Sequence, residues 1–385
     1  MSSVAAGREL NTEDISGCDW EALLKEARQQ AVLLPLTDAL PALGESVPEE
    51  IRELCAQSAL GMVARNTKVE HAQRQLVKLL ENAGLDYVIL KGEASASYYP
   101  RPELRQLGDV DFLVPSGHRE QATRLLMEAG YERSLENHGH HQVFQKPGAH
   151  LEMHSRLAGM PEGVLGEKIQ AYLDRHFPLG VQGAFRAPAP QLHGLVLVLH
   201  MQHHMLSEGI GLRHLMDWGC FVQKTAREPF WQQELLPLLK ELGLLVYACA
   251  MTGTAALYLG TACPDWADAD EELCRDIIED ILAGGNFGGK NYARARSGNM
   301  LQKQGHKKSG SRVRHLYETL HRSVLQQHPE LKDKKALIPV HMVYRAPRYT
   351  VLHLKGERPS LIKAAAYAKE RAPVYERLQI FETEE

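Results

Sequence analysis

Cysteine is scarce in this chain of 385 residues, long apolar runs are missing, and the net charge is small. The six cysteines are scattered and form no C-x-x-C pair, which argues against a disulfide framework and a cysteine-based zinc site. No run approaches the roughly 18 apolar residues of a membrane span, and the N-terminus lacks a basic-then-apolar signal, so we expect a cytoplasmic protein with no membrane partner. A formal charge of −4 argues against a large, non-specific nucleic-acid surface.

What the chain does have is the composition of a folded protein with a sizeable core. Its hydrophobic content of 44% and charged content of 24% are ordinary, and its length allows two or three units. Periodicity predicts an α+β fold, in which helical regions at residues 1–83 and 191–385 flank a small mixed β-sheet core at 84–190. Strands are predicted at 85–90, 109–114, 131–135, 141–146 and 149–154. Helices are predicted at 49–81 (one or two), 93–99, 117–129, 192–206, 211–226, 231–260, 270–283, 311–328 and 360–379.

Two aspartates separated by one valine give the strongest functional signal. The segment Gly108 to Val114 reads G-D-V-D-F-L-V, and in a strand the period of two places Asp109 and Asp111 on one face and Val110 on the other. Two like charges there are costly unless cations neutralise them. A pair of Mg²⁺ ions about 3.5–4 Å apart would do so and leave places for phosphates. The alternative is an ordinary turn aspartate followed by an exposed aspartate of an edge strand.

Upstream of the aspartates, the chain offers groups suited to phosphate. The first predicted strand ends at Lys91-Gly92, and a glycine where a strand turns into a helix lets backbone N–H groups approach a phosphate. Arg105 follows, four residues before Asp109. We predict that Lys91 and Arg105 supply positive charge to a triphosphate and that Gly92 shapes the phosphate turn. Taken singly, both cations are also compatible with ordinary solvated positions.

A third carboxylate lies in the segment His150-Leu151-Glu152-Met153-His154, which alternates polar and apolar residues. A strand here places His150, Glu152 and His154 on one face. Glu152 would then face the aspartate pair, hold the catalytic metal and help to activate an acceptor hydroxyl as general base. The competing interpretation is a zinc site made by His150, His154 and the nearby His138, His140 and His141.

The order L-K-G, then R-x-x-G-D-V-D-F-L-V, then a strand with E-M-H resembles the polymerase-β-like nucleotidyltransferases. Within them it is similar to the broad, largely uncharacterised group of bacterial nucleotidyltransferase family proteins. The resemblance implies a nucleotidyltransferase core with its turn at Gly92, its metal-binding pair at Asp109 and Asp111, and its third metal carboxylate at Glu152. The chain departs from the superfamily pattern where Glu93 follows Gly92, since Gly-Ser or Gly-Gly is widespread at that turn.

The resemblance continues more loosely through residues 200–222, in helices that close over nucleotide and acceptor in that superfamily. His200, His203 and His204 share one helix face by their spacing. Arg213 and Asp217 are four residues apart, which permits an intrahelical ion pair. Asp217 is a further candidate for the site, and helix packing with polar edges is the competing explanation.

Two other segments need to be weighed as binding motifs. Gly284 to Lys290 fits G-x-x-x-x-G-K, but Asn291 replaces the Ser or Thr that binds Mg²⁺ and the preceding segment is helical. We interpret it as a loop after a helix. Lys303 to Arg314 is basic and contains Gly and Ser, so a solvated loop is the simpler interpretation, and contact with an acidic acceptor such as RNA is the alternative.

These features together predict an enzyme, a nucleotidyltransferase that uses two Mg²⁺ ions, for which Mn²⁺ can substitute. Its expected substrates are a nucleoside triphosphate and an acceptor hydroxyl, and its second product is pyrophosphate. The sequence does not specify the preferred base or the acceptor, which could be a protein, a peptide, RNA or a small molecule. Three alternatives are open: a nucleotide-binding regulatory protein on the same fold without catalysis, a zinc hydrolase, and a helical interaction module.

Overall fold

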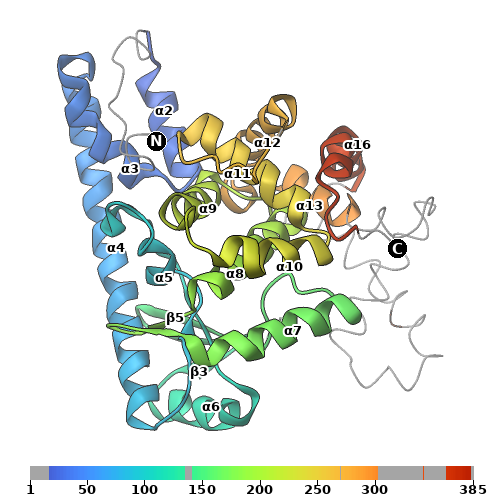
Figure 1. Cartoon of the computed structure of the whole chain (residues 1–385). Helices are drawn as coiled ribbons and strands as arrows, with labels where there is room; N and C mark the ends of the chain where they lie inside the picture. Colours follow the sequence, from blue (N-terminus) through green and yellow to red (C-terminus); the bar gives the residue numbers. More distant parts are fainter. Residues whose placement is uncertain (1–16, 135–140, 269, 302–340, 342–360, 383–385) are drawn as a thin grey trace.

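The computed structural model describes residues 17–134, 141–268, 270–301, 341 and 361–382 of the chain. Helical regions flank one small sheet, which confirms the predicted α+β class (Figure 1). The strands are β1 (Val88–Ile89), β2 (Val110–Leu113), β3 (Glu132–Arg133), β4 (His141–Lys146), β5 (Ala149–His154), β6 (Val181–Gln182) and β7 (Arg186–Ala187). The α-helices are α2 (Trp20–Gln29), α3 (Leu33–Ala39), α4 (Glu49–Asn82), α5 (Glu93–Ala96), α6 (Arg119–Glu128), α7 (Val164–His176), α8 (Pro190–Ser207), α9 (Leu212–Thr225), α10 (Leu236–Glu241), α11 (Leu245–Leu259), α12 (Glu271–Gly284), α13 (Tyr292–Leu301) and α16 (Leu361–Leu378).

The main sheet has the strand order β1-β2-β5-β4-β3. β2 and β5 run parallel, whereas the other three neighbouring pairs are antiparallel, so the sheet is mixed as predicted. β4 and β5 coincide with the predicted strands 141–146 and 149–154 and meet at the predicted turn, where Gly148 has φ +81°. β1, β2 and β3 are shorter than predicted, because strand ends are set by backbone pairing and not by apolar character alone.

One face of the main sheet is covered by helices α4 and α6. Phe112 of β2 and Leu151 of β5 are buried there in one apolar cluster with the second half of α4. Since neighbouring residues of a strand point to opposite faces, Asp111 and Glu152 point to the other face. Leu113, which shares that other face, packs in the same apolar cluster as helices α8 and α9. The sheet therefore presents its carboxylates on the side of α8 and α9.

Helix α4 is a single helix of 34 residues, whereas the sequence was compatible with either one or two helices there. At a rise of 1.5 Å per residue it is about 50 Å long, and Figure 1 shows it running along the whole side of the molecule. Its second half packs on the sheet, whereas Ile51 and Cys55 in its first half join the cluster shared by α2, α3 and the C-terminal helices. The division of the chain at residues 83 and 190 stays a prediction.

The C-terminal half of the chain is helical. The prediction of one helix at 231–260 is wrong: a π-helical turn η6 (Trp231–Leu235), α10 and α11 occupy this segment. Pro237 stands at the start of α10, and Gly243, with φ +64°, lies in the break between α10 and α11. Among the described helices, none alone is long and apolar enough to cross a membrane. Only the pair Trp231–Glu241 and Leu245–Leu259, bent by 119°, has the required length and apolar character when the two helices are taken together. The predicted helix 311–328 and the segment Lys303 to Arg314 lie outside the described residues.

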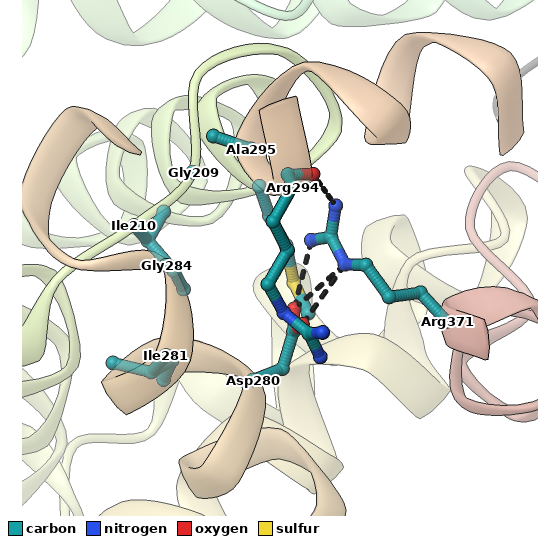
Figure 2. Close-up of a pocket in the computed structure, with 9 residues that line it drawn as sticks. Gly209, Ile210, Asp280, Ile281, Gly284, Arg294, Ala295 and Arg371 are labelled. Carbon is teal, nitrogen blue, oxygen red and sulfur yellow. Dashed lines mark hydrogen bonds and ion pairs between the residues drawn. The ribbon is translucent and has the colours of Figure 1, made fainter. Parts of the chain in front are cut away.

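A buried charge cluster connects α16 to the rest of the helices (Figure 2). Asp280 of α12 pairs with Arg371 of α16, whose Nη2 lies 2.7 Å from Asp280 Oδ2, and with Arg294 of α13 at 2.8 Å. Arg294 also pairs with Glu370 at 2.7 Å, so two guanidinium groups meet two carboxylates and the charges balance. A small cavity beside the cluster is lined by Met205, Gly209, Ile210, Asp280, Ile281, Gly284, Arg294, Ala295 and Arg371. We interpret this cluster as a structural connection, because it offers no unbalanced charge to a ligand.

The segment Gly284 to Lys290 is a loop that follows helix α12, as expected, with a single 3₁₀ turn η7 (Asn286–Gly288). Lys290 is engaged in packing, because its Nζ lies 2.7 Å from Glu26 Oε2 of α2. Phe287 points back to the helix pair α8 and α9, where its ring centre lies 4.9 Å from that of His204 and 5.3 Å from that of His214. The loop therefore contributes an aromatic side chain to the region above the sheet carboxylates.

Candidate active site

Strands β2 and β5 bring the three predicted carboxylates together. Their parallel register pairs Asp111 with Glu152, and Asp109 lies two residues before Asp111. Asp109 is exposed, whereas Asp111 is buried. Desolvation raises the pKa of Asp109 above its ordinary value, and the negative charges of Asp111 and Glu152 add to the rise against the opposing field of His150. Crowded like charges of this kind are relieved by a cation.

Asp111 is the fully compensated member of the group. Its Oδ1 atom lies 2.8 Å from Lys91 Nζ and 2.9 Å from His154 Nε2. Burial by itself favours the neutral acid, but the Lys91 ammonium and the His154 contact outweigh it and hold the pKa of Asp111 well below its usual range. Lys91 Nζ also lies 2.8 Å from Nε2 of His200 in α8. Asp111 is therefore ionised, and both of these contacts are made through its Oδ1 atom.

Glu152 lies among three imidazoles. Its Oε1 is 3.6 Å from His150 Nε2, and its Oε2 is 3.7 Å from His141 Nε2 and 3.8 Å from His154 Nε2. His141 reaches this place because the antiparallel register of β4 and β5 sets it opposite His154. Burial pushes the pKa of Glu152 up, but the contact with His150 and the field of His141 outweigh it and keep that pKa below its ordinary value. Glu152 is thus an ionised carboxylate, as a metal ligand or general base must be.

The side chains here include two sets that could hold a metal ion. In the first, the ligand atoms of Asp109, His150 and Glu152 lie within 4.8 Å of one another; in the second, those of His141, Glu152 and His154 do. The carboxylate oxygens of Asp109 and Glu152 in the first set suit a hard cation such as Mg²⁺ or Mn²⁺, so two of the three predicted ligands fit the predicted metal. Asp111 belongs to neither of these two sets, and His150 completes the first one. The two imidazoles of the second set suit Zn²⁺. His138 and His140, named in the zinc alternative, lie outside the described residues.

The predicted turn at Gly92 is formed between β1 and the single-turn helix α5. Gly92 has φ +65° and ψ −118°, a backbone conformation that residues with a Cβ rarely adopt. A Cβ at this position would lie 3.9 Å from the carbonyl oxygen of Asp109, so the turn lies directly against the aspartate strand. Its contact with phosphate stays a prediction.

Arg105 is buried and turned toward helix α9. Its Nε and Nη2 lie 2.7 Å and 2.8 Å from the two carboxylate oxygens of Asp217, and the Tyr99 hydroxyl donates to Asp217 Oδ1 at 2.8 Å. Asp217 therefore pairs with Arg105 and not with Arg213, its neighbour one helical turn away. The ion pair fixes the loop that leads into β2. Phosphate contact by Arg105 stays a prediction, and it would require this bidentate pair to open.

The role of Asn66 could not be predicted from the sequence. This residue is buried in the middle of α4, where its side-chain amide donates to the Arg105 carbonyl at 3.0 Å and accepts from the Leu107 N–H at 2.9 Å. A polar residue within a long helix has no pattern that sets it apart from a solvated one. Asn66 thus holds the same loop from the α4 side that Asp217 holds from the α9 side.

Neutral histidines line the α8 and α9 side of the site. His200 and His204 stack edge to face with ring centres 4.4 Å apart, and His214 of α9 lies 5.5 Å from His200 and 5.7 Å from His204. Burial lowers the pKa of all three below the ordinary imidazole value, and the positive charge of Lys91 lowers it further. They are therefore uncharged at neutral pH, and His200 can accept a hydrogen bond from Lys91.

Carboxylates on neighbouring strands, a glycine turn and a lysine beside them form the arrangement that the motifs predicted for a nucleotidyltransferase. The chain matches the sequence profile of the uncharacterised nucleotidyltransferase family over residues 16–260, and it belongs to that family. This confirms the resemblance seen in the motifs, and the matched region contains Asp109, Asp111 and Glu152. No curated protein and no solved structure matches the chain.

Proposed function

We propose that this protein is a Mg²⁺-dependent nucleotidyltransferase, which moves a nucleoside monophosphate from a nucleoside triphosphate to an acceptor hydroxyl and releases pyrophosphate. The observation that carries the proposal is the register of β2 and β5, which sets Asp111 opposite Glu152 with Asp109 two residues away. Membership of a nucleotidyltransferase family supports the class of reaction. We further propose that the protein works in the cytoplasm.

Two Mg²⁺ ions, for which Mn²⁺ can substitute, would be held by Asp109, Asp111 and Glu152. Bound there, the ions would polarise the α-phosphate and stabilise charge on the leaving pyrophosphate. Asp111 would bind through its second carboxylate oxygen, because Lys91 and His154 both contact Oδ1. Lys91, beside Asp111 and next to the turn at Gly92, would contact phosphate.

In the reaction, covalent bonds form and break only within the substrates, and Glu152 acts as the general base. The acceptor oxygen forms a bond to the α-phosphorus while the bond from that phosphorus to the bridging oxygen of the β-phosphate breaks. Glu152 takes the proton that the acceptor hydroxyl loses and later gives it to solvent. Its pKa, held below the ordinary value by His150 and His141 against the effect of burial, keeps Glu152 ionised, which is the form that a general base requires.

The test is incubation of the purified protein with each of the four α-³²P-labelled nucleoside triphosphates and Mg²⁺ or Mn²⁺, alone and in cell extract. We expect label on a discrete acceptor with the wild type and none with Asp109→Ala or Asp111→Ala. Glu128→Ala removes an exposed carboxylate from α6, on the other side of the sheet, and should keep full activity. A parallel reaction with γ-³²P-labelled ATP should give no labelled acceptor, because nucleotidyl transfer leaves the γ-phosphate in pyrophosphate.

Two results would remove the proposal. Transfer that persists in a folded Asp109→Ala or Asp111→Ala variant would show that the carboxylates are not the machinery. Nucleotide binding without transfer to any acceptor, in the presence of either metal, would favour the alternative of a nucleotide-binding regulatory protein on the same fold. The labelled species itself would identify the acceptor as protein, peptide, RNA or small molecule.

A further inference from the structure

Arg213, in the first turn of α9, lies beside the proposed active site. Its Nη1 donates to the carbonyl of Gln106 at 3.4 Å, three residues before Asp109 in the chain. The aromatic ring of Phe287 lies on its other side, with the ring centre 5.6 Å from the guanidinium carbon. The field of Asp109 also reaches the guanidinium. Loop, ring and helix thus hold Arg213 at the end of the site where Asp109 is exposed.

The charge of Arg213 has no direct counterpart among the described residues. Its Nε atom is inaccessible to solvent and makes no hydrogen bond, and no carboxylate in the described part of the chain forms an ion pair with it. The other two cations of the site are each compensated, Lys91 by Asp111 at 2.8 Å and Arg105 by Asp217 at 2.7 Å. A desolvated guanidinium without an anion is unfavourable, so the position is explained best by an anion that arrives with a ligand.

The electrostatics around Arg213 support the same explanation. Burial lowers the pKa of Arg213 below its ordinary value, and the neighbouring positive charge of Arg105 lowers it further; the field of Asp217, one helical turn away, opposes both effects only in part. Guanidinium groups nevertheless stay protonated in proteins, so the charge is held here at a cost. An anion beside the guanidinium would relieve both effects.

We propose that Arg213 binds the triphosphate of the nucleotide substrate, an inference that rests on the proposed function. The planar guanidinium offers a fork of N–H donors that suits phosphate oxygens, and among these donors Nη1 contacts the Gln106 carbonyl whereas Nε makes no hydrogen bond. The field of Asp109, a carboxylate assigned to the metal, reaches Arg213, so a triphosphate bound with its metal would interact with both groups. Arg213 thereby fills the role that the sequence suggested for Arg105, whose two donors are engaged by Asp217.

The experiment measures binding of Mg²⁺-tripolyphosphate and Mg²⁺-ATP to the full chain by calorimetry. Arg213→Met should weaken both on the order of tenfold to a hundredfold, because a charge-assisted hydrogen bond is lost. Arg213→Lys keeps the positive charge without the fork of N–H donors, so its affinity should lie between those of the wild type and Arg213→Met. Arg124→Met, an exposed arginine of α6 on the far face of the sheet, is the matched control and should bind as the wild type does.

The outcomes separate this inference from the function on which it rests. Binding of both ligands within about twofold of wild type in Arg213→Met and Arg213→Lys would overturn the role of Arg213 and leave the proposed function intact. A lower melting temperature with unchanged affinity would do the same, because it would mark a purely structural contact to the Gln106 loop. A wild-type protein that binds neither Mg²⁺-ATP nor Mg²⁺-tripolyphosphate would overturn both proposals together.

Discussion

Removal of Asp217 is expected to destabilise the fold strongly, because it leaves a buried guanidinium without its anion. The side chains of Arg105 and Asp217 are 6% and 8% exposed and meet through two hydrogen bonds of 2.7 Å and 2.8 Å. Burial opposes the charge of Arg105, yet Asp217 outweighs it and raises the pKa of Arg105 above its ordinary value. Breaking such a pair from one side costs about 3–5 kcal/mol. Asp217→Ala should therefore lower the free energy of unfolding by about that amount.

Urea and thermal unfolding would measure this loss in a double-mutant cycle. At about 2–4 °C per kcal/mol, Asp217→Ala should lower the melting temperature by about 6–20 °C. Arg105→Met combined with Asp217→Leu should recover most of the loss, since no buried charge then lacks a partner. Glu162→Ala is the control, because its 2.8 Å pair with Arg156 is exposed. It should cost less than about 1 kcal/mol.

The reasoning would be refuted if Asp217→Ala cost no more than Glu162→Ala. It would also be refuted if the double replacement were as unstable as the two single replacements added together, since this would show that Arg105 and Asp217 act independently. Either result would mean that solvent reaches the Arg105 guanidinium in spite of its burial.

Two further predictions concern pH and zinc. Burial lowers the pKa of His193 to about 4 from an ordinary value near 6.5, so the unfolded chain binds this proton first as the solution becomes acidic. The stability that neutral His193 contributes is complete above about pH 7 and is lost toward pH 4, and the loss is about 2 kcal/mol at pH 5. Denaturation curves measured at several pH values should show a smaller loss of stability in His193→Gln. Equal dependence of the free energy of unfolding on pH in both proteins would contradict this. Zn²⁺ should inhibit transfer by binding His141, Glu152 and His154. His141→Asn should raise the inhibitory Zn²⁺ concentration on the order of tenfold. Equal inhibition of the wild type and the variant would exclude that site.

Local pattern was enough to predict the parts of the site that lie within single strands. Alternation in residues 149–154 placed Glu152 on the polar face of β5. The D-V-D segment predicted a strand at 109–114, and β2 takes Val110–Leu113 of it, so that Asp111 lies within the strand and Asp109 just before it. The glycine turn was predictable because a lone glycine between a strand and a helix has few other uses. These features depend on neighbours in the sequence, so the sequence alone carries them.

The partners of these residues could not be predicted, because they come from distant parts of the chain. Asp217, which engages Arg105, lies 112 residues away, and His200, which contacts Lys91, lies 109 residues away. The sequence suggested Arg213 as the partner of Asp217 because it lies one helical turn away. In the folded chain, helix α9 packs so that Asp217 forms its ion pair with Arg105 instead. Arg213 is then left without a carboxylate in direct contact.

Among the described residues of the site, charges of both signs lack a full counterpart, and the field of Asp109 reaches Arg213. Asp109 and Glu152 carry negative charge that the histidines around them offset only in part, and Arg213 carries positive charge that no carboxylate of the described chain pairs with. A metal ion alone would satisfy the carboxylates, and a free anion alone would satisfy Arg213. A metal–nucleoside triphosphate complex carries both signs in one ligand and satisfies both groups at once. The charge pattern therefore favours binding of metal and triphosphate together over binding of either one alone.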